Sequence, residues 1–455
     1  MMLSLLWTDL LVWGLLFVLL MLGWGASKSP QVREQWHTIF KSKIAIASTI
    51  ILLFYLFFTL LDSVHLRFAV EPREGNSEQI QYSEIVSVLD IIFAHNIEGT
   101  ERTYSAPFAL HEYTKSIAVD ENAVTTQEYL PLKHVSNRDD SVQTSLIAIM
   151  TGLAISMLLM SVHILWRARE GFKHEFKLRM QGKTDIPWRT AYVTMTLLIT
   201  LFTWFYMLSF DYHVLGTDKV GGDVFYQSLK SIRTGVLIGI LTTLIMLPVA
   251  ILLGVSAGLF GGWVDDVIQY LYTTLSSIPG VLLIAAGVLS MQVMMNNNPT
   301  WFESTLERSD LRLLFLILIL GITSWTGLCR LLRAETLKVS QMEFVIAAKA
   351  FGVSKLTIIR RHIIPNLMHI ILISVVLDFS GLVLAEAVLS YVGVGVDPTM
   401  HSWGNMINQA RLEMARDPMV WWSLFSAFVF MFILVLAANL LSDRVQTVLD
   451  PRNKS

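Results

Sequence analysis

The sequence predicts an all-α integral membrane protein with about nine transmembrane helices, and two observations lead to this prediction. Of its 455 residues, 54% are hydrophobic and only 15% are charged, whereas soluble domains carry roughly 25% charged residues. The apolar residues also gather in blocks of about 20, the length at which a helix crosses the hydrocarbon core of a bilayer. The single cysteine, Cys329, excludes a disulfide framework and a cysteine-based metal site.

Each apolar block is one predicted span. In chain order the spans are residues 3–24, 44–66, 144–166, 190–210, 233–258, 267–292, 312–330, 367–390 and 419–441. The first block exceeds the roughly 7–15 residues of a signal-peptide core and no basic residue precedes it, so we expect a membrane helix there. The sixth is the least regular, because residues 267–277 are polar and Pro279 follows them.

Basic residues gather in three of the segments between spans, at 25–43, 167–189 and 330–366. Because Lys and Arg are enriched in cytoplasmic loops, we expect all three on the cytoplasmic side, and nine alternating spans allow this. The N-terminus then lies outside and the C-terminus in the cytoplasm. Residues 67–143 form an acid-rich extracytoplasmic segment, in which the helical spacing of apolar residues predicts an amphipathic helix from Gln79 to Phe93.

The chain offers no recognisable catalytic motif. Gly182-Lys183-Thr184 resembles the end of a phosphate-binding loop, but Lys177 stands where that motif needs its first glycine. His362 and His369 lie seven residues apart near a membrane face, where packing or capping is expected rather than metal binding. We therefore expect no enzyme activity, no cofactor and no metal in this chain, so active transport would draw its energy from another subunit.

The segment 331–366 predicts two short helices joined at a corner. Met342 to Phe351 favours a helix, and Gly352 suits its C-terminal end because glycine adopts a left-handed conformation without a side-chain penalty. Ser354 can cap a second helix directly after it, and we expect Pro365 to end that helix before the next span. From these residues alone, an ordinary basic loop between spans is an equal alternative.

This segment resembles the signature loop of binding-protein-dependent ABC permeases, in which two alanines are followed by a glycine and later a proline. Ala347, Ala348, Gly352 and Pro365 match those positions, whereas Ile346 stands where a glutamate often precedes the alanines. The resemblance implies that the segment docks and couples to an ATPase. The residues expected to take part are Glu343, Ala347, Ala348, Gly352, Val353, Ser354, Lys355 and Pro365.

Other short motifs resemble the C-type subunit of dipeptide, oligopeptide and nickel permeases and follow in that family's order between residues 213 and 452. They are His213 to Asp218, Gly261 to Asp265, Ala385 to Gly393, Ser402 to Met406 and Leu449 to Arg452, with the basic run Phe40 to Lys43 resembling the family's N-terminal helix. Gly221-Gly222-Asp223 departs from the family's Gly-Arg-Asp.

The resemblance also implies a division of the chain. We expect N-terminal transmembrane helices in 1–66, an extracytoplasmic segment in 67–143, an additional helix pair in 144–210 and the permease core in 211–455. The core would hold six spans, the last five and one earlier helix. The first, third and fourth spans and the outer segment are then additions to the family plan.

As a function, the resemblance implies one permease subunit of an ATP-driven importer in a bacterial inner membrane. Di- or oligopeptides are the expected substrates, and nickel or another small solute is the alternative. The implied partners are a second permease subunit that completes a heterodimer, two cytoplasmic ATPase subunits that bind ATP and Mg, and an extracytoplasmic solute-binding protein.

Two rival functions rest on other features. An ion-coupled secondary transporter would use carboxylates inside the membrane and no ATPase, and dependence of uptake on an ion gradient would identify it. A receptor or scaffold without transport activity would be built around residues 67–143. Neighbouring genes for two ATPases and a binding protein would exclude it.

Two carboxylates in the eighth predicted span are candidates for the translocation path. Asp378 lies near the middle of that span and Glu386 two turns further on. A charge at mid-membrane costs at least roughly 2.5–3.5 kcal/mol, so such residues usually face the protein interior or a water-filled path. Asp378 either lines the path and holds a cationic peptide terminus, or forms a hydrogen bond with a neighbouring helix.

Overall fold

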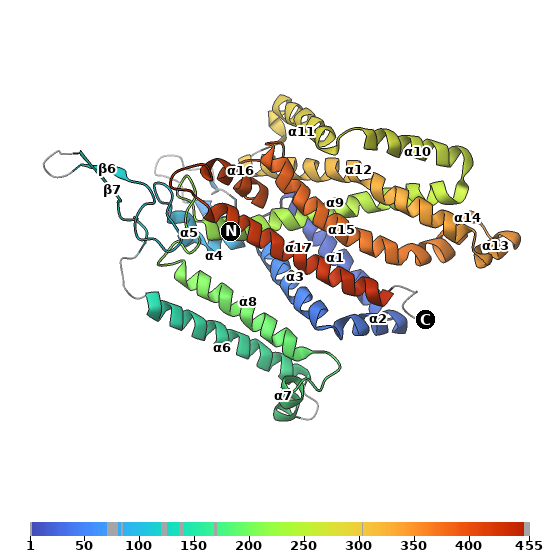
Figure 1. Ribbon diagram of the computed structural model, residues 1–455, viewed down its shortest axis with the longest axis horizontal. Coiled ribbons are helices and arrows are strands. Elements are labelled where there is room, and N and C mark those ends of the chain that lie inside the picture. The colour runs from blue at the N-terminus through green and yellow to red at the C-terminus, as the bar shows by residue number, and fades with distance from the viewer. Residues whose placement is uncertain are drawn as a thin grey trace. The chain divides into compact units, whose positions relative to one another are not determined.

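The computed structural model describes residues 2–70, 81–82, 85–119, 125–135, 141–167, 171–302 and 304–449 (Figure 1). The terminal motif Leu449 to Arg452 lies outside these residues apart from Leu449. In chain order, the elements are β1 (Met2–Ser4), α1 (Trp7–Ser27), α2 (Pro30–Phe40), α3 (Lys43–Asp62), β2 (His65–Arg67), β3 (Ala69–Val70), β4 (Gln81–Tyr82), β5 (Val86–Ser87), α4 (Val88–Ile92), α5 (Ala94–Glu98), β6 (Ser116–Val119), β7 (Thr125–Glu128), α6 (Ser141–Arg167), α7 (Phe172–Met180), α8 (Trp188–Leu208), α9 (Val224–Phe260), α10 (Gly262–Ser277), α11 (Gly280–Asn297), η1 (Pro299–Trp301), α12 (Thr305–Ser340), α13 (Glu343–Ala350), α14 (Lys355–Ile358), η2 (Ile359–Ile363), α15 (Ile364–Tyr391), α16 (Trp403–Glu413) and α17 (Trp422–Leu449).

Within the described residues, nine helices are long and apolar enough to cross a membrane. They are α1, α3, α6, α8, α9, α11, α12, the continuous helix formed by α14, η2 and α15, and α17. The prediction of an all-α membrane protein with nine spans is therefore confirmed. The helices α9 and α12, of 37 and 36 residues, are longer than a bilayer crossing requires.

The predicted sixth span, 267–292, is wrong in its first half. Its polar start belongs to α10, which is not among the helices apolar enough to span. The spanning helix is α11, which begins only at Gly280. The helix breaks at Ile278, whose backbone is extended, because the following Pro279 disfavours a helical conformation in the residue before it.

The described part of the outer segment consists of short strands and two short helices. Strands β1, β2 and β5 form an antiparallel sheet, and β6 pairs with β7 in a hairpin. The predicted amphipathic helix from Gln79 to Phe93 is wrong before Val88, since residues 86–87 are a strand; residues 79–80 and 83–84 lie outside the described part. Ser87 starts α4 through a reciprocal capping box with Asp90.

The chain divides into two compact units. The first contains Met1–Leu5, Val12–Gly235 and His401–Leu441, and the second contains Leu6–Leu11, Val236–Met400 and Ser442–Ser455.

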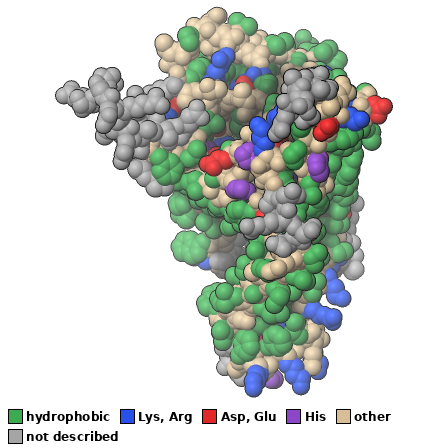
Figure 2. All heavy atoms as spheres, turned by 90° about the vertical axis from the view of Figure 1, so that its left-hand side faces the viewer, with side chains coloured by type: hydrophobic (Ala, Val, Ile, Leu, Met, Phe, Trp, Pro, Cys, Tyr) green, Lys and Arg blue, Asp and Glu red, His purple; other side chains and the backbone are tan. Residues whose placement is uncertain are grey.

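In the first unit, α6 and α8 pack along their length as a pair. A Cβ atom added to Gly152 of α6 would lie 2.7 Å from the Cα of Thr200 on α8, so glycine permits this close approach. On the other side of α8, the Phe202 ring contacts the rings of Phe54 and Phe58 from α3. Figure 2 shows hydrophobic side chains covering the lower part of this face, and Lys and Arg side chains at its lower end, where α7 lies in Figure 1.

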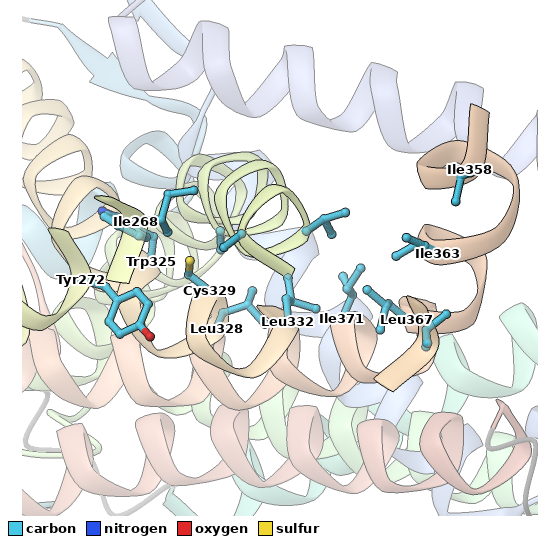
Figure 3. Close-up of a cluster of buried hydrophobic side chains, with 14 of the residues drawn as sticks. Ile268, Tyr272, Trp325, Leu328, Cys329, Leu332, Ile358, Ile363, Leu367 and Ile371 are labelled. Atoms are coloured by element: carbon cyan, nitrogen blue, oxygen red, sulfur yellow. The ribbon is translucent and has the colours of Figure 1, made fainter. Parts of the chain in front are cut away.

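In the second unit, a row of buried apolar side chains runs from α10 past α12 to α14 and the start of α15 (Figure 3). Tyr272 lies at one end of the row and Ile358 at the other, with Cys329 fully buried between them. Cys329 thus occupies the position of a small apolar residue in α12. The row therefore connects the membrane helices to the short helices that follow α12.

Helices α9 and α12 approach closely along this row. A Cβ atom on Gly254 would lie 2.7 Å from the Cys329 carbonyl oxygen, and one on Gly258 would lie 2.6 Å from the Thr336 Cβ. Two glycines four residues apart thus give α9 a flat strip against α12, the arrangement that lets membrane helices pack backbone to backbone.

Candidate functional site

The turn between α13 and α14 is closed by a pair of backbone hydrogen bonds. The Gly352 N–H donates to the Lys349 carbonyl at 3.0 Å, and the Val353 N–H donates to the Ala348 carbonyl at 3.1 Å. This pair is the Schellman pattern that ends a helix. Gly352 has a φ of +73°, so the predicted corner is confirmed.

A side chain at Gly352 would be disfavoured by backbone conformation and not by crowding. An added Cβ atom there would meet nothing within 4 Å. The left-handed conformation costs a residue with a side chain on the order of 1 kcal/mol or more. Substitution should therefore change the angle of the corner without disturbing neighbouring packing.

The second helix begins where the sequence predicts. The Ser354 hydroxyl accepts a hydrogen bond from the Thr357 N–H at 3.4 Å, and α14 starts at Lys355. The prediction that Pro365 ends this helix is wrong, because the chain continues through the π-helical turn η2 into α15. A proline ring clashes with the carbonyl four residues earlier, and the wider π turn just before it gives the chain room to remain helical.

The inner face of the corner is anchored in the apolar row of the second unit. Val345 and Ile358 are almost fully buried, and Ala348 is 9% exposed. Val353, next to the turn, is half-buried and packs against the same cluster. The two short helices are therefore held on the protein by side chains on both sides of Gly352.

The outer face of the corner carries large apolar side chains that this chain leaves exposed. We call them the exposed apolar set; they are Met342, Phe344, Ile346, Phe351 and Leu356. Phe351 is 87% exposed and Leu356 is 75% exposed. Exposed apolar side chains grouped on a short stretch are typical of interaction surfaces.

The remaining predicted residues of the corner lie on or beside this outer face. Glu343, Ala347 and Lys355 are exposed, and Pro365 is exposed at the start of α15. Ile346 is 54% exposed, so it presents an apolar side chain beside Ala347 at the position where the related loops often have a glutamate. The two alanines thus differ, since Ala348 faces the core and Ala347 faces outward.

The motif Gly261 to Asp265 positions α10 against α12. Gly261 and Gly262 both have positive φ angles, which let the chain turn from α9 into α10. The Asp265 carboxylate then accepts two hydrogen bonds from the Arg333 guanidinium of α12, one of them at 2.6 Å. This pairing holds the pKa of Asp265 below its usual range. Sequence reasoning found the motif but missed Arg333, whose partner lies 68 residues away.

The two carboxylates of α15 have different surroundings. Glu386 is almost fully buried and accepts a hydrogen bond from the Ser390 hydroxyl at 2.8 Å; that hydroxyl also accepts from the Val396 N–H. Asp378 is half-buried, and within the described residues no hydrogen bond or ion pair reaches its carboxylate. The alternative of a bond from Asp378 to a neighbouring helix therefore finds no support in the described part of this chain.

A second cluster joins the outer segment to the start of α9. His213 lies with its Nδ1 3.0 Å from an Asp223 oxygen and its Nε2 3.7 Å from a Glu101 oxygen. Glu101 also accepts hydrogen bonds from the backbone N–H groups of Lys133 and His134. Glycine at position 221 allows this contact, since a Cβ atom there would lie 1.9 Å from the Glu101 carbonyl oxygen.

A half-buried lysine on α9 completes this attachment. The Lys230 ammonium lies 3.3 Å from an Asp62 oxygen and also contacts the Asp90 carboxylate. Burial alone would raise the pKa of Asp90, but Lys230 and hydrogen bonds from Ser87 and Tyr226 hold it below its usual range. We call Asp62, Asp90, Glu101, His213, Asp223 and Lys230 together the outer seat.

Comparison with known proteins gives a consistent result. Residues 250–455 match the family described as "Binding-protein-dependent transport system inner membrane component". The chain is 30% identical over 240 residues to the dipeptide transport system permease protein DppC of Bacillus subtilis, covering 53% of this chain and 69% of the relative. It is 32% identical over 243 residues to the glutathione transport system permease protein GsiD of Pectobacterium atrosepticum, covering 53% of this chain and 74% of the relative. It is 31% identical over 243 residues to the oligopeptide transport system permease protein OppC of Mycobacterium tuberculosis, covering 53% of this chain and 77% of the relative.

Proposed function

We propose that this chain, which belongs to the peptide group of binding-protein-dependent ABC transporter permeases, imports di- or oligopeptides through a translocation path of which it forms one half. Members of this family are transporter subunits of the inner membrane and not catalytic enzymes. The peptide substrate is supported by the dipeptide, glutathione and oligopeptide permeases that it resembles. Nickel or another small solute is the second candidate.

We infer that the corner around Gly352 docks an ATPase. The observation that supports this proposal is the contrast between its two faces. The exposed apolar set offers an interface whose apolar side chains, Phe351 above all, could enter a cleft on a partner. The inner face keeps Val345 and Ile358 in the core.

Transmission of movement follows from this attachment. Because the same apolar row contains side chains of α10, α12 and α15 (Figure 3), a push on the corner reaches several helices through packed contacts. Packed interfaces favour a few discrete arrangements over continuous deformation. Closure of the ATPases around ATP and Mg would thus move the spans of this unit between inward-open and outward-open arrangements.

The proposed assembly contains this chain, a second permease subunit, two cytoplasmic ATPase subunits and an extracytoplasmic solute-binding protein. We place the corner in the cytoplasm with the C-terminus, and the outer segment and the N-terminus outside, since the basic segments between spans favour this orientation. Asp378 is proposed to face the path, because a half-buried carboxylate in a span needs a polar or aqueous partner.

The test uses the reconstituted transporter with Gly352→Asp. We expect normal amounts of the chain in the membrane. Either the ATPases should co-purify more weakly, or ATP hydrolysis should continue without driving dipeptide uptake. Gly182→Asp is the matched control. Gly182 ends α7 with the same pair of backbone bonds, has a φ of +68° and leaves open space for a Cβ atom.

The two variants share backbone strain and added charge but differ in location. Full coupling of ATP hydrolysis to uptake in Gly352→Asp vesicles would contradict the docking proposal. Uptake is measured with a labelled dipeptide and with Ni²⁺ in parallel. Transport of Ni²⁺ alone would replace the peptide assignment and leave the docking proposal standing.

A further inference from the structure

A basic cavity lies where the chain leaves α1 and enters α2. It is lined by Lys28, Pro30, Arg33, Glu34 and His37 and has a volume of about 380 Å³. Ligand sites for small molecules have volumes of about 300–1,000 Å³. The cavity is therefore large enough for a compact polar group.

The charges around the cavity are unbalanced. The lining contains one lysine, one arginine and one glutamate, a net charge of +1 with histidine neutral. Within the described part of the chain, no hydrogen bond or ion pair reaches the side chains of Arg33 and His37. The Lys28 ammonium lies 3.5 Å from the centre of the Trp24 ring. The cavity thus presents cationic groups without an internal counter-ion, apart from Glu34.

The neighbouring elements place this cavity at the surface of a membrane. The apolar part of α1 ends at Gly25 and the next span begins at Lys43, so the residues between them emerge at the level of the lipid headgroups. Trp24 and Trp36 are both exposed, by 64% and 47%, and tryptophan is enriched at membrane interfaces. Ile39 is buried and anchors α2 to the protein.

We propose that this cavity binds the headgroup phosphate of an anionic phospholipid from the adjoining leaflet. The two flanking spans bring lipid headgroups to the cavity, whereas a soluble anion would gain nothing from the exposed tryptophans. A zwitterionic headgroup would bring a cation toward Lys28 and Arg33 and lose part of the attraction. This site is independent of peptide transport and of the ATPase proposal.

Native mass spectrometry of the full-length chain in detergent tests the site, with added phosphatidylglycerol, phosphatidylcholine or inorganic phosphate. We expect tighter binding of phosphatidylglycerol than of phosphatidylcholine. Lys28→Gln with Arg33→Gln should weaken phosphatidylglycerol binding roughly thirtyfold, since each basic residue near an anionic membrane surface contributes a factor of roughly five to six. Glu34→Gln should strengthen it.

Two control variants keep the result interpretable. Lys173→Gln with Lys183→Gln removes two exposed lysines from another segment between spans and should leave the bound lipid unchanged. Lys28→Arg with Arg33→Lys preserves the charge and should bind as the original chain does. Loss of lipid in this second pair would overturn the proposal, because charge would then not be the determinant.

Three further results would also overturn the proposal. The first is equal binding of phosphatidylglycerol and phosphatidylcholine, and the second is unchanged phosphatidylglycerol binding in the Lys28→Gln, Arg33→Gln variant. The third is that inorganic phosphate binds in the absence of lipid and displaces bound phosphatidylglycerol.

Discussion

In the corner around Gly352, the side chains that hold the short helices are apolar, and the charged residues lie on the exposed face. In the outer seat the holding residues are charged, and buried carboxylates lie against Lys230 and His213. Apolar contacts have no direction and tolerate small shifts, whereas a buried ion pair requires a fixed geometry. The difference suggests that the outer segment is fixed to its unit and that the corner can move.

The largest effect is expected from breaking the outer seat at Lys230. Lys230→Met would leave the buried Asp62 and the half-buried Asp90 without their cation, and loss of one partner from a buried ion pair costs about 3–5 kcal/mol. We expect a low folded yield and a lower thermal unfolding temperature. Lys219→Met, at an exposed lysine in the loop just before α9, is the control and should unfold as the original chain does. Equal unfolding temperatures would mean that the charged pairs do not hold the outer segment.

A smaller effect is expected at the support of the corner. Gly258→Ala would place a Cβ atom 2.6 Å from the Thr336 Cβ and 2.8 Å from the Arg333 carbonyl oxygen, and overpacking of this kind costs about 1–3 kcal/mol. Gly327→Ala, in α12 and with open space around it, should be neutral or stabilising because alanine favours helices. Thermal unfolding of both variants measures the difference. If the Gly258→Ala chain were as stable as the original, α9 and α12 would be able to move apart around the added methyl group at little cost.

Asp378 differs from the carboxylates of the outer seat, which lie against Lys230 or His213. It belongs to the second unit, and within the described residues no hydrogen bond or ion pair reaches its carboxylate. If it faces the translocation path, Asp378→Asn should lower peptide uptake several-fold, most strongly for peptides with a cationic terminus. Assembly and basal ATP hydrolysis should stay unchanged. Initial uptake rates in reconstituted vesicles measure this effect, and a normal rate would assign Asp378 to packing.

The last effect is absent at neutral pH and concerns acid stability near the outer seat. Burial, with Lys230 nearby, lowers the pKa of His401 to about 4, while the unfolded chain keeps a value of about 6.5. Below pH 6.5 the unfolded state therefore binds a proton that the folded state excludes, so stability falls as the pH drops from about 6.5 to about 4. His401→Gln should lack this decline. Unfolding temperatures measured across that pH range check the prediction.

Sequence reasoning located the corner better than the outer seat, because the corner is determined by neighbouring residues. Gly352 and Ser354 act on backbone groups within five residues, and both were identified from their type and spacing. The contacts between Lys230 and Asp90, and between His213 and Glu101, join residues more than 100 positions apart. No local pattern predicts such pairs.

The errors have the same origin. The predicted sixth span runs across Pro279, although the chain breaks there and the spanning helix begins only at Gly280. At Pro365 the opposite happened, since a π turn absorbed the proline and the helix continued. The corner's role, the pathway residues and the domain division stay predictions.

The π turn at Ile359–Ile363 also determines how α14 is rotated about the helix axis relative to α15. A π turn holds one residue more than an α turn, and one residue corresponds to about 100° of rotation in an α-helix. The face that α14 presents is therefore turned by about that angle from where an uninterrupted α-helix would place it. A chain shortened by one residue in this turn would keep its spans and caps, yet would point Leu356 in another direction.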